Sequence, residues 1–132
     1  MKIVVSPNPY RDKQFKNARQ ACSILREAGA EVALCLPFDV DKTIEIPHDL
    51  RFQDIQKEIK TADMLICFGG DGTILHSSKI ATEHNLPILG VNIGTMGFIA
   101  ELESGEIELL RRIPKGEYTV EERTMLDVSV GN

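Results

Sequence analysis

The sequence predicts an α/β fold built on a doubly wound, mainly parallel sheet. Short apolar runs of strand length alternate along the chain with segments whose apolar residues recur at helical spacing. Such alternation is typical of parallel strands that helices bury on both faces. Turns rich in glycine or proline separate the segments. The length of 132 residues suits one domain, since domains run to roughly 100–200 residues.

The first half of the chain is expected to contain three strands and two helices. Residues 3–5 are β-branched and suit a buried strand, which the loop at residues 6–10 ends. Asp12 is placed to cap a helix that continues until Gly29, a left-handed C-cap. The remaining elements are a strand at 32–36, an irregular segment at 38–50, a short amphipathic helix at 52–59 and a strand at 64–68.

The second half repeats the alternation. A helix is expected from Thr73 to about His84, and its small residues would let it pack closely on a sheet. Another helix is expected to begin at Ser104 with a weak capping box, because Glu106 and Glu108 flank the third position after it. The other elements are a strand at 87–91, a turn at 114–116 and strands at 118–123 and 125–130.

Two glycine-bearing turns follow neighbouring strands. The first is Gly69-Gly70-Asp71-Gly72-Thr73, and the second spans residues 92–98. Glycines let a backbone approach a phosphate closely, and N–H groups at the start of a helix attract anions. Ligands of parallel sheets bind outside the carboxyl ends of the strands. The loops after Val5, Phe68 and Val91 leave from that edge, so we expect the two turns to face one crevice.

Several other kinds of site are excluded by their missing motifs. The chain has no Walker A loop, no G-x-G-x-x-G fingerprint and no G-x-S-x-G elbow. Its histidines, His48, His76 and His84, lack metal-ligand spacing, so we predict no metal-ligating residue set. What remains is a phosphate cradle that contains an acid, Asp71, which suits phosphoryl transfer. The plain alternative is a tight turn in which Asp71 only caps the helix.

Composition and charge limit which partners the chain is expected to bind and in which cellular compartment it is expected to lie. The net charge of −5 argues against non-specific binding of nucleic acid, and the apolar stretches are too short to span a membrane. The three cysteines, Cys22, Cys35 and Cys67, lie far apart in apolar contexts and form no C-x-x-C pair. We therefore expect reduced, buried thiols and a cytoplasmic location.

The two turns together resemble the NAD kinase family. Its pattern is G-G-D-G-T followed one strand later by N-x-G-x-x-G-F, and residues 69–73 and 92–98 match it. Diacylglycerol and sphingosine kinases also carry the first motif, and phosphofructokinases carry a close relative, so the combination is the specific signal. The resemblance implies the N-terminal fold that NAD kinases share with phosphofructokinases. It also implies ATP-dependent, or in some members polyphosphate-dependent, phosphorylation of the adenosine-ribose 2′-hydroxyl of NAD to give NADP.

The resemblance assigns roles to the first turn. Asp71 would be the general base that takes the hydroxyl proton. The turn from Gly69 onward would bind the nucleotide, with the backbone of Gly70, Gly72 and Thr73 holding phosphate oxygens together with Mg²⁺.

Three further residues are implied to lie near the ligands. His76 would lie near the dinucleotide, although a surface helical histidine is the plain alternative. Phe98 would lie near the adenine of NAD, with a core aromatic as its alternative. Asn92 is expected to order the second turn through side-chain bonds to the backbone.

The chain departs from the family in length. NAD kinases carry a second, mostly β domain with further NAD-binding residues, and Glu122-Arg123 followed by Met125-Leu126 is similar to the entry into that domain. We therefore assign residues 1–116 to the nucleotide-binding domain and 117–132 to the truncated start of a β-rich domain. The fragment alone is expected to be inactive, and the full-length enzyme is expected to be a homo-oligomer.

Two alternative functions stay open at this point. A diacylglycerol-kinase-like lipid kinase would share the first turn, but residues 1–132 contain no Lys/Arg cluster for a membrane surface. A non-catalytic nucleotide-binding module would need neither the second domain nor a membrane.

Overall fold

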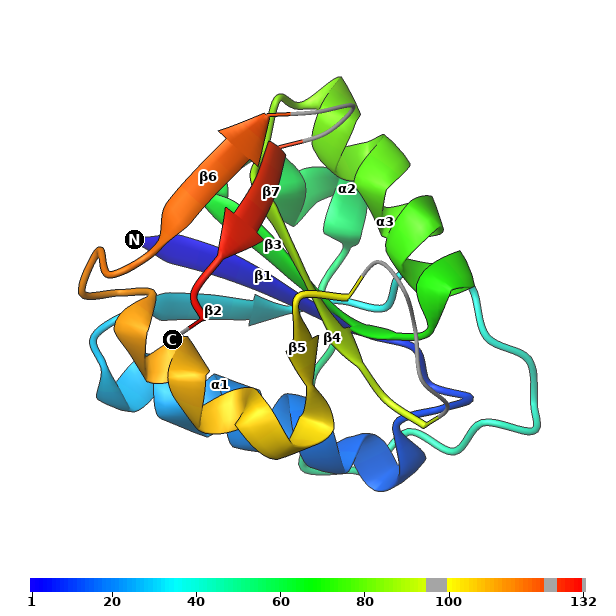
Figure 1. The fold of residues 1–132 in the computed structure, drawn as a ribbon. Coiled ribbons are helices and arrows are strands. Elements are labelled where there is room, and N and C mark those ends of the chain that lie inside the picture. The colour runs from blue at the N-terminus through cyan, green and yellow to red at the C-terminus, as the bar shows by residue number, and fades with distance from the viewer. Residues whose placement is uncertain (95–99, 123–125, 132) are drawn as a thin grey trace.

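The computed structural model describes residues 1–94, 100–122 and 126–131, and in them it has the predicted α/β fold. The sheet runs in the order β2-β1-β3-β4-β7-β6, with β5 beside β4 (Figure 1). The strands are β1 (Lys2–Pro7), β2 (Glu31–Leu34), β3 (Met64–Gly69), β4 (Ile88–Asn92), β5 (Leu102–Glu103), β6 (Thr119–Glu122) and β7 (Leu126–Ser129). The α-helices are α1 (Lys16–Glu27), α2 (Ile55–Glu58) and α3 (Asp71–Glu83), and the 3₁₀ helices are η1 (Lys13–Phe15), η2 (Ile59–Thr61) and η3 (Ser104–Arg112).

Strands β1 to β4 are parallel, and residues of each are buried on both faces of the sheet. All six residues of β3 are buried. Ile66 and Phe68 belong to the core on one face of the sheet, whereas Leu65 and Cys67 belong to the core on the other. Burial on both sides explains why these strands read as continuous apolar runs instead of alternating with polar residues.

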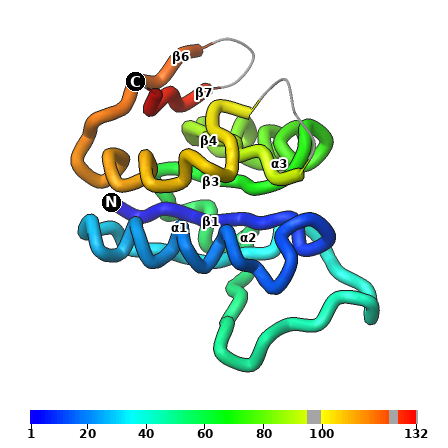
Figure 2. Tube along the Cα trace, turned by 60° about the horizontal axis from the view of Figure 1, so that its bottom comes forward, coloured from blue at the N-terminus to red at the C-terminus, as the bar shows by residue number. Residues whose placement is uncertain are grey.

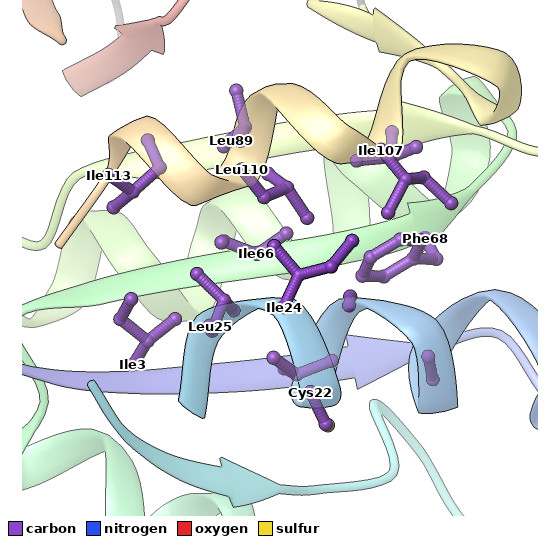
Figure 3. Close-up of a cluster of buried hydrophobic side chains, with 14 of the residues drawn as sticks. Ile3, Cys22, Ile24, Leu25, Ile66, Phe68, Leu89, Ile107, Leu110 and Ile113 are labelled. Atoms are coloured by element: carbon purple, nitrogen blue, oxygen red, sulfur yellow. The ribbon is translucent and has the colours of Figure 1, made fainter. Parts of the chain in front are cut away.

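Helices α1 and η3 cover one face of the sheet, and α2 and α3 cover the other (Figure 1). Figure 2 shows α1 and η3 side by side. The core beneath them is drawn in Figure 3, where Ile24 of α1, Leu110 of η3 and Ile66 of β3 lie close together.

Several boundaries differ from the sequence-based expectation, and β5 was not expected at all; two of the differences have a clear physical reason. Strand β1 continues through Ser6 and Pro7, which pair with Cys67 and Phe68. Proline is tolerated there because the pairing with β2 ends at Val5 and Leu34, so Pro7 has a neighbouring strand on one side only. Helix η3 is a 3₁₀ helix whose N-cap is Glu103, one residue earlier than the residue expected. Glu106 then occupies the third helical position, and its carboxylate accepts a 3.0 Å bond from the backbone N–H of Glu103.

The C-terminal hairpin extends the same sheet. Strands β6 and β7 are antiparallel, and β7 pairs with β4 in parallel at Ile88 and Asp127. Val128 and Val130 are buried in the core under α1 and η3. The division of the chain after residue 116 stays a prediction. In the described part of the chain, no helix is long and apolar enough to cross a membrane.

Candidate active site

The candidate site lies where the chain leaves the sheet in two directions. Strand β1 lies between β2 and β3, and the chain after β1 enters α1 on one face. The chain after β3 enters α3 on the opposite face. Loops that diverge in this way leave a crevice at the carboxyl ends of the strands, where ligands of doubly wound sheets bind.

The first glycine turn passes directly from β3 into α3. A methyl group on Gly69 would lie 2.6 Å from Oγ1 of Thr73, so only glycine lets the Thr73 hydroxyl pack against the strand end. Gly70 is the N-cap of α3 and has an extended conformation, with φ −97° and ψ −172°. The close packing of the strand end against α3 therefore depends on Gly69, whereas the backbone conformation of Gly70 is open to any residue.

Asn8 ties the loop after β1 to this turn. Its backbone N–H donates to the carbonyl of Phe68 at 2.8 Å, and its Nδ2 donates to Oγ1 of Thr73 at 2.8 Å. Its own carbonyl accepts from the N–H groups of Arg11 at 3.1 Å and Asp12 at 2.9 Å. One asparagine thus holds the β1 loop and the start of α3 in a fixed relation.

A cavity of about 380 Å³ opens between these loops. The loops after β1, β2 and β3 all contribute to its wall, as expected for loops that leave one edge of a parallel sheet. The lining residues that the structure describes are Asn8, Arg11, Phe38, Gly70, Asp71, Gly72, Thr73 and His76.

The cavity combines a carboxylate with the start of a helix. Asp71 is the first residue of α3 and is half-buried. The first backbone N–H groups of an α-helix have no acceptor within the helix, and Gly70 has no side chain that could accept from Gly72 or Thr73. These N–H groups suit a phosphate oxygen. A carboxylate beside a phosphate-binding helix start can accept a proton from a hydroxyl that attacks the phosphate.

His76 lines the cavity but is held by the loop after β2. Its Nε2 lies 2.9 Å from the carbonyl oxygen of Pro37, and because that oxygen can only accept, Nε2 carries the proton. Its ring meets Phe38 edge-on, with 5.9 Å between the ring centroids. His76 therefore joins α3 to the wall of the cavity and leaves Nδ1 for another contact.

Of the second turn, residues 92–98, the structure describes residues 92–94. Asn92, 3 % exposed, donates from Nδ2 to the Glu103 carboxylate at 2.9 Å, and its Oδ1 has no hydrogen-bond partner among the residues that the structure describes. This bond goes to a side chain, whereas the sequence suggested bonds to the backbone of the turn. Gly94, which has φ +97°, lies beside Arg11. Phe98 is outside the described residues.

Comparison with known proteins decides the family. Residues 3–118 match the family model described as the ATP-NAD kinase N-terminal domain. The chain belongs to the NAD kinase family.

Two curated NAD kinases illustrate the similarity. The one from Corynebacterium diphtheriae is 32% identical over 133 residues, covering 98% of this chain and 42% of that protein. The one from Methanopyrus kandleri is 38% identical over 117 residues, covering 86% of this chain and 39% of that protein. This chain thus spans less than half the length of these relatives.

A solved structure agrees with the fold. Yeast NADH kinase complexed with NADH superposes with a TM-score of 0.67 at 19% identity, over 93% of this chain and 40% of that chain. At this identity the likeness supports the arrangement of strands and helices. The comparisons give no support to the lipid-kinase alternative.

Three residues of the NAD kinase cavity were not anticipated from the sequence: Asn8, Arg11 and Phe38. The expected edge loops did include the one that contains Asn8 and Arg11. However, no local motif distinguishes these residues from ordinary loop residues. Phe38 comes from the segment whose sequence was the least regular, and only the fold brings it to the cavity.

A larger cavity, of about 840 Å³, lies between the start of α1 and residues 43–48. It contains none of the described residues of the two glycine turns. We place the candidate chemistry in the smaller cavity because its wall contains the first glycine turn, with Asp71 and the start of α3.

Cysteine chemistry plays no part in the candidate site. Cys67 lies in β3, two residues before Gly69, and burial raises the pKa of its thiol to about 12. At neutral pH the thiol stays protonated and is not a nucleophile. The described residues also contain no group of three His, Cys, Asp or Glu side chains that could hold a metal ion.

Proposed function

We propose that the protein to which this chain belongs phosphorylates the adenosine-ribose 2′-hydroxyl of NAD, with ATP or polyphosphate as donor, to give NADP. This chain supplies the N-terminal part of the active site. The observation that carries the proposal is the position of Asp71, at the start of α3 and in the wall of a cavity that belongs to an NAD kinase fold.

Asp71 is proposed to be the general base. Its carboxylate accepts the proton of the 2′-hydroxyl while the hydroxyl oxygen forms a new bond to the terminal phosphorus of the donor. The bond from that phosphorus to the leaving oxygen breaks, and the shortened donor departs. The N–H groups of Gly72 and Thr73, at the start of α3, are proposed to donate to the oxygens of the phosphate that moves.

Magnesium fits this set of residues. Mg²⁺ in phosphoryl transfer is commonly held by one or two carboxylates together with the phosphates of the substrate. Asp71 is the carboxylate that the described lining residues offer. When bound with the donor, the ion would neutralise charge on the phosphate chain.

The remaining assignments have weaker support. His76 is proposed to lie near the dinucleotide, which its Nδ1 could contact, and Phe98 is proposed to lie near the adenine. Asn92 is proposed to order the second turn through its bond to Glu103. A cytoplasmic location is supported by the three free cysteines. Self-association of the full-length protein is proposed from the family resemblance.

The direct test is Asp71→Asn in the full-length protein. We expect the rate of NADP formation from NAD and ATP to fall by about 10²- to 10⁴-fold, because an amide cannot accept the hydroxyl proton. The change keeps the size of the side chain, so the melting temperature should stay close to that of the wild type.

Glu83→Gln is the matched control, since this exposed acid lies at the other end of the same helix. It should leave the rate unchanged. A turnover rate of Asp71→Asn near the wild-type value would contradict the assignment of Asp71 as the general base. A full-length protein that phosphorylates diacylglycerol but not NAD would overturn the function itself.

A further inference from the structure

The guanidinium of Arg11 lies between the two glycine turns. A methyl group built on Gly70 would lie 3.6 Å from Cζ of Arg11, and one built on Gly94 would lie 3.3 Å from its Nη1. Gly70 belongs to the turn after β3, and Gly94 follows β4. One cation from the loop after β1 therefore reaches the backbone at the ends of two neighbouring strands.

The fold holds the backbone of Arg11 in place. Its N–H donates to the carbonyl of Asn8 at 3.1 Å, and Asn8 is bonded in turn to Phe68 and Thr73. The side chain itself is exposed. Arg11 is thus anchored through its backbone while its guanidinium extends into the wall of the cavity.

The guanidinium makes no ion pair with another side chain in the described part of the chain. Two other arginines do form ion pairs: Arg19 pairs with Asp49, and Arg111 pairs with Glu27 and Glu108. Arg11 shares its cavity with the N–H groups at the start of α3. A planar guanidinium beside backbone donors forms a site for an anion with several oxygens.

We propose that Arg11 binds the terminal phosphates of the phosphate donor. The inference rests on the proposed function and adds a residue and a ligand group to it. In the proposed reaction the hydroxyl to be phosphorylated lies at the Asp71 carboxylate, and the phosphate that moves lies between that hydroxyl and the N–H groups at the start of α3. A cation in the wall of that same cavity is adjacent to this phosphate and to the next one along the donor chain.

The test uses the full-length protein and two probes. Isothermal titration calorimetry measures the affinity for inorganic tripolyphosphate, and steady-state kinetics measure KM for ATP and for NAD. In Arg11→Gln we expect about 10- to 100-fold weaker binding of tripolyphosphate, a comparable rise in KM for ATP, and KM for NAD within about twofold of the wild type. The tripolyphosphate affinity and the KM for ATP of Arg11→Lys should lie between those of the wild type and Arg11→Gln, because lysine keeps the charge but lacks the planar set of N–H donors.

Arg26→Gln is the matched control. Arg26 is exposed on α1 and lines a different cavity, so its loss should change neither probe by more than about twofold. Melting temperatures check that the variants fold.

Tripolyphosphate affinity that is unchanged in Arg11→Gln, or absent in the wild type, would overturn the proposal. So would a rise in KM for NAD alone, which would assign Arg11 to the acceptor. A protein that makes no NADP yet binds tripolyphosphate through Arg11 would contradict the proposed function but leave this inference standing.

Discussion

Asn8 joins two loops that lie 65 residues apart along the chain. Its side chain donates to Thr73 and accepts from the N–H of Tyr10 at 2.9 Å, so both ends of the amide are used. A loop asparagine usually bonds to its own backbone, and Tyr10 fits that pattern. The bond to Thr73 could not be foreseen, because it exists only after β1 and β3 have paired.

At the same scale, the buried cysteines make stability depend on pH. Burial raises the pKa of the Cys22 thiol from 9.0 to about 11, while Arg26 lowers it in part. Between these values the thiol ionises in the unfolded chain but not in the folded one. The free energy of unfolding should therefore be unaffected by this group below pH 9.0 and should fall by up to about 1.4 kcal/mol per pH unit above it.

Urea denaturation of this chain between pH 8 and about 10.5 measures the effect, with Cys22→Ala as the comparison. The variant should lose less stability per pH unit than the wild type, since it lacks the titrating thiol. Equal slopes for the two proteins would contradict the assignment.

At the scale of elements, α1 begins through an unusual local arrangement. Gln14 and Phe15 both have φ of 55°, which is uncommon for residues other than glycine and costs of order 1 kcal/mol or more each. Two contacts offset this cost. The Phe15 ring is buried against Phe52, and the carboxylate of Asp12 accepts bonds at 2.9 Å from the N–H groups of Asn17 and Ala18. Asp12 thus accepts from the first turn of α1, as the sequence predicted, but the N-cap residue of α1 is Phe15 and η1 lies between.

Asp12→Ala should destabilise the chain by about 2 kcal/mol, because two N–H groups near a buried position lose their acceptor. Asp54→Ala is the comparison, since Asp54 caps α2 through one exposed bond to Gln56 and its loss should cost about 1 kcal/mol. Urea denaturation of both variants gives the values. A loss in Asp12→Ala no larger than that in Asp54→Ala would argue against the role of Asp12.

At the scale of the whole molecule, the centre of the sheet is more deeply buried and more extensively paired than the edge formed by β6. Strands β1, β3 and β4 are continuous and covered on both faces, whereas β6 is exposed in all four residues and pairs only with β7 among the described strands. Among the described residues, one pair in the β-ladder, Ile88 and Asp127, joins the hairpin to β4. Buried apolar contacts set local stability, so the two parts should open separately.

Hydrogen exchange followed by mass spectrometry should show this difference. In this chain we expect peptides from β6 to exchange at least about tenfold faster than peptides from β3, whose six residues are buried. Equal protection of the two strands would mean that the hairpin unfolds only together with the core.

The sequence by itself determined the position of the first glycine turn and the order of the strands and helices along the chain, apart from η1 and β5. Residues 69–73 can be recognised in the sequence because a strand-to-helix turn needs glycine and threonine at fixed neighbouring positions. Periodicity likewise located the core strands, since burial on both faces leaves continuous apolar runs. The η3 cap was missed by one residue because serine is the preferred cap residue, whereas the cap in the structure is Glu103, which has Glu106 at the third helical position.

The tertiary structure alone decided what surrounds Asp71. Arg11, Phe38 and His76 come from three separate segments, and none is within hydrogen-bonding distance of the others along an extended chain. Parallel pairing of β1, β2 and β3 brings the loops that follow them to one edge, and the opposite courses of α1 and α3 open the cavity there. The residues of the turn itself can therefore be identified from the local sequence. The groups that face the turn depend on the order of the strands in the sheet, which is set by contacts between distant residues.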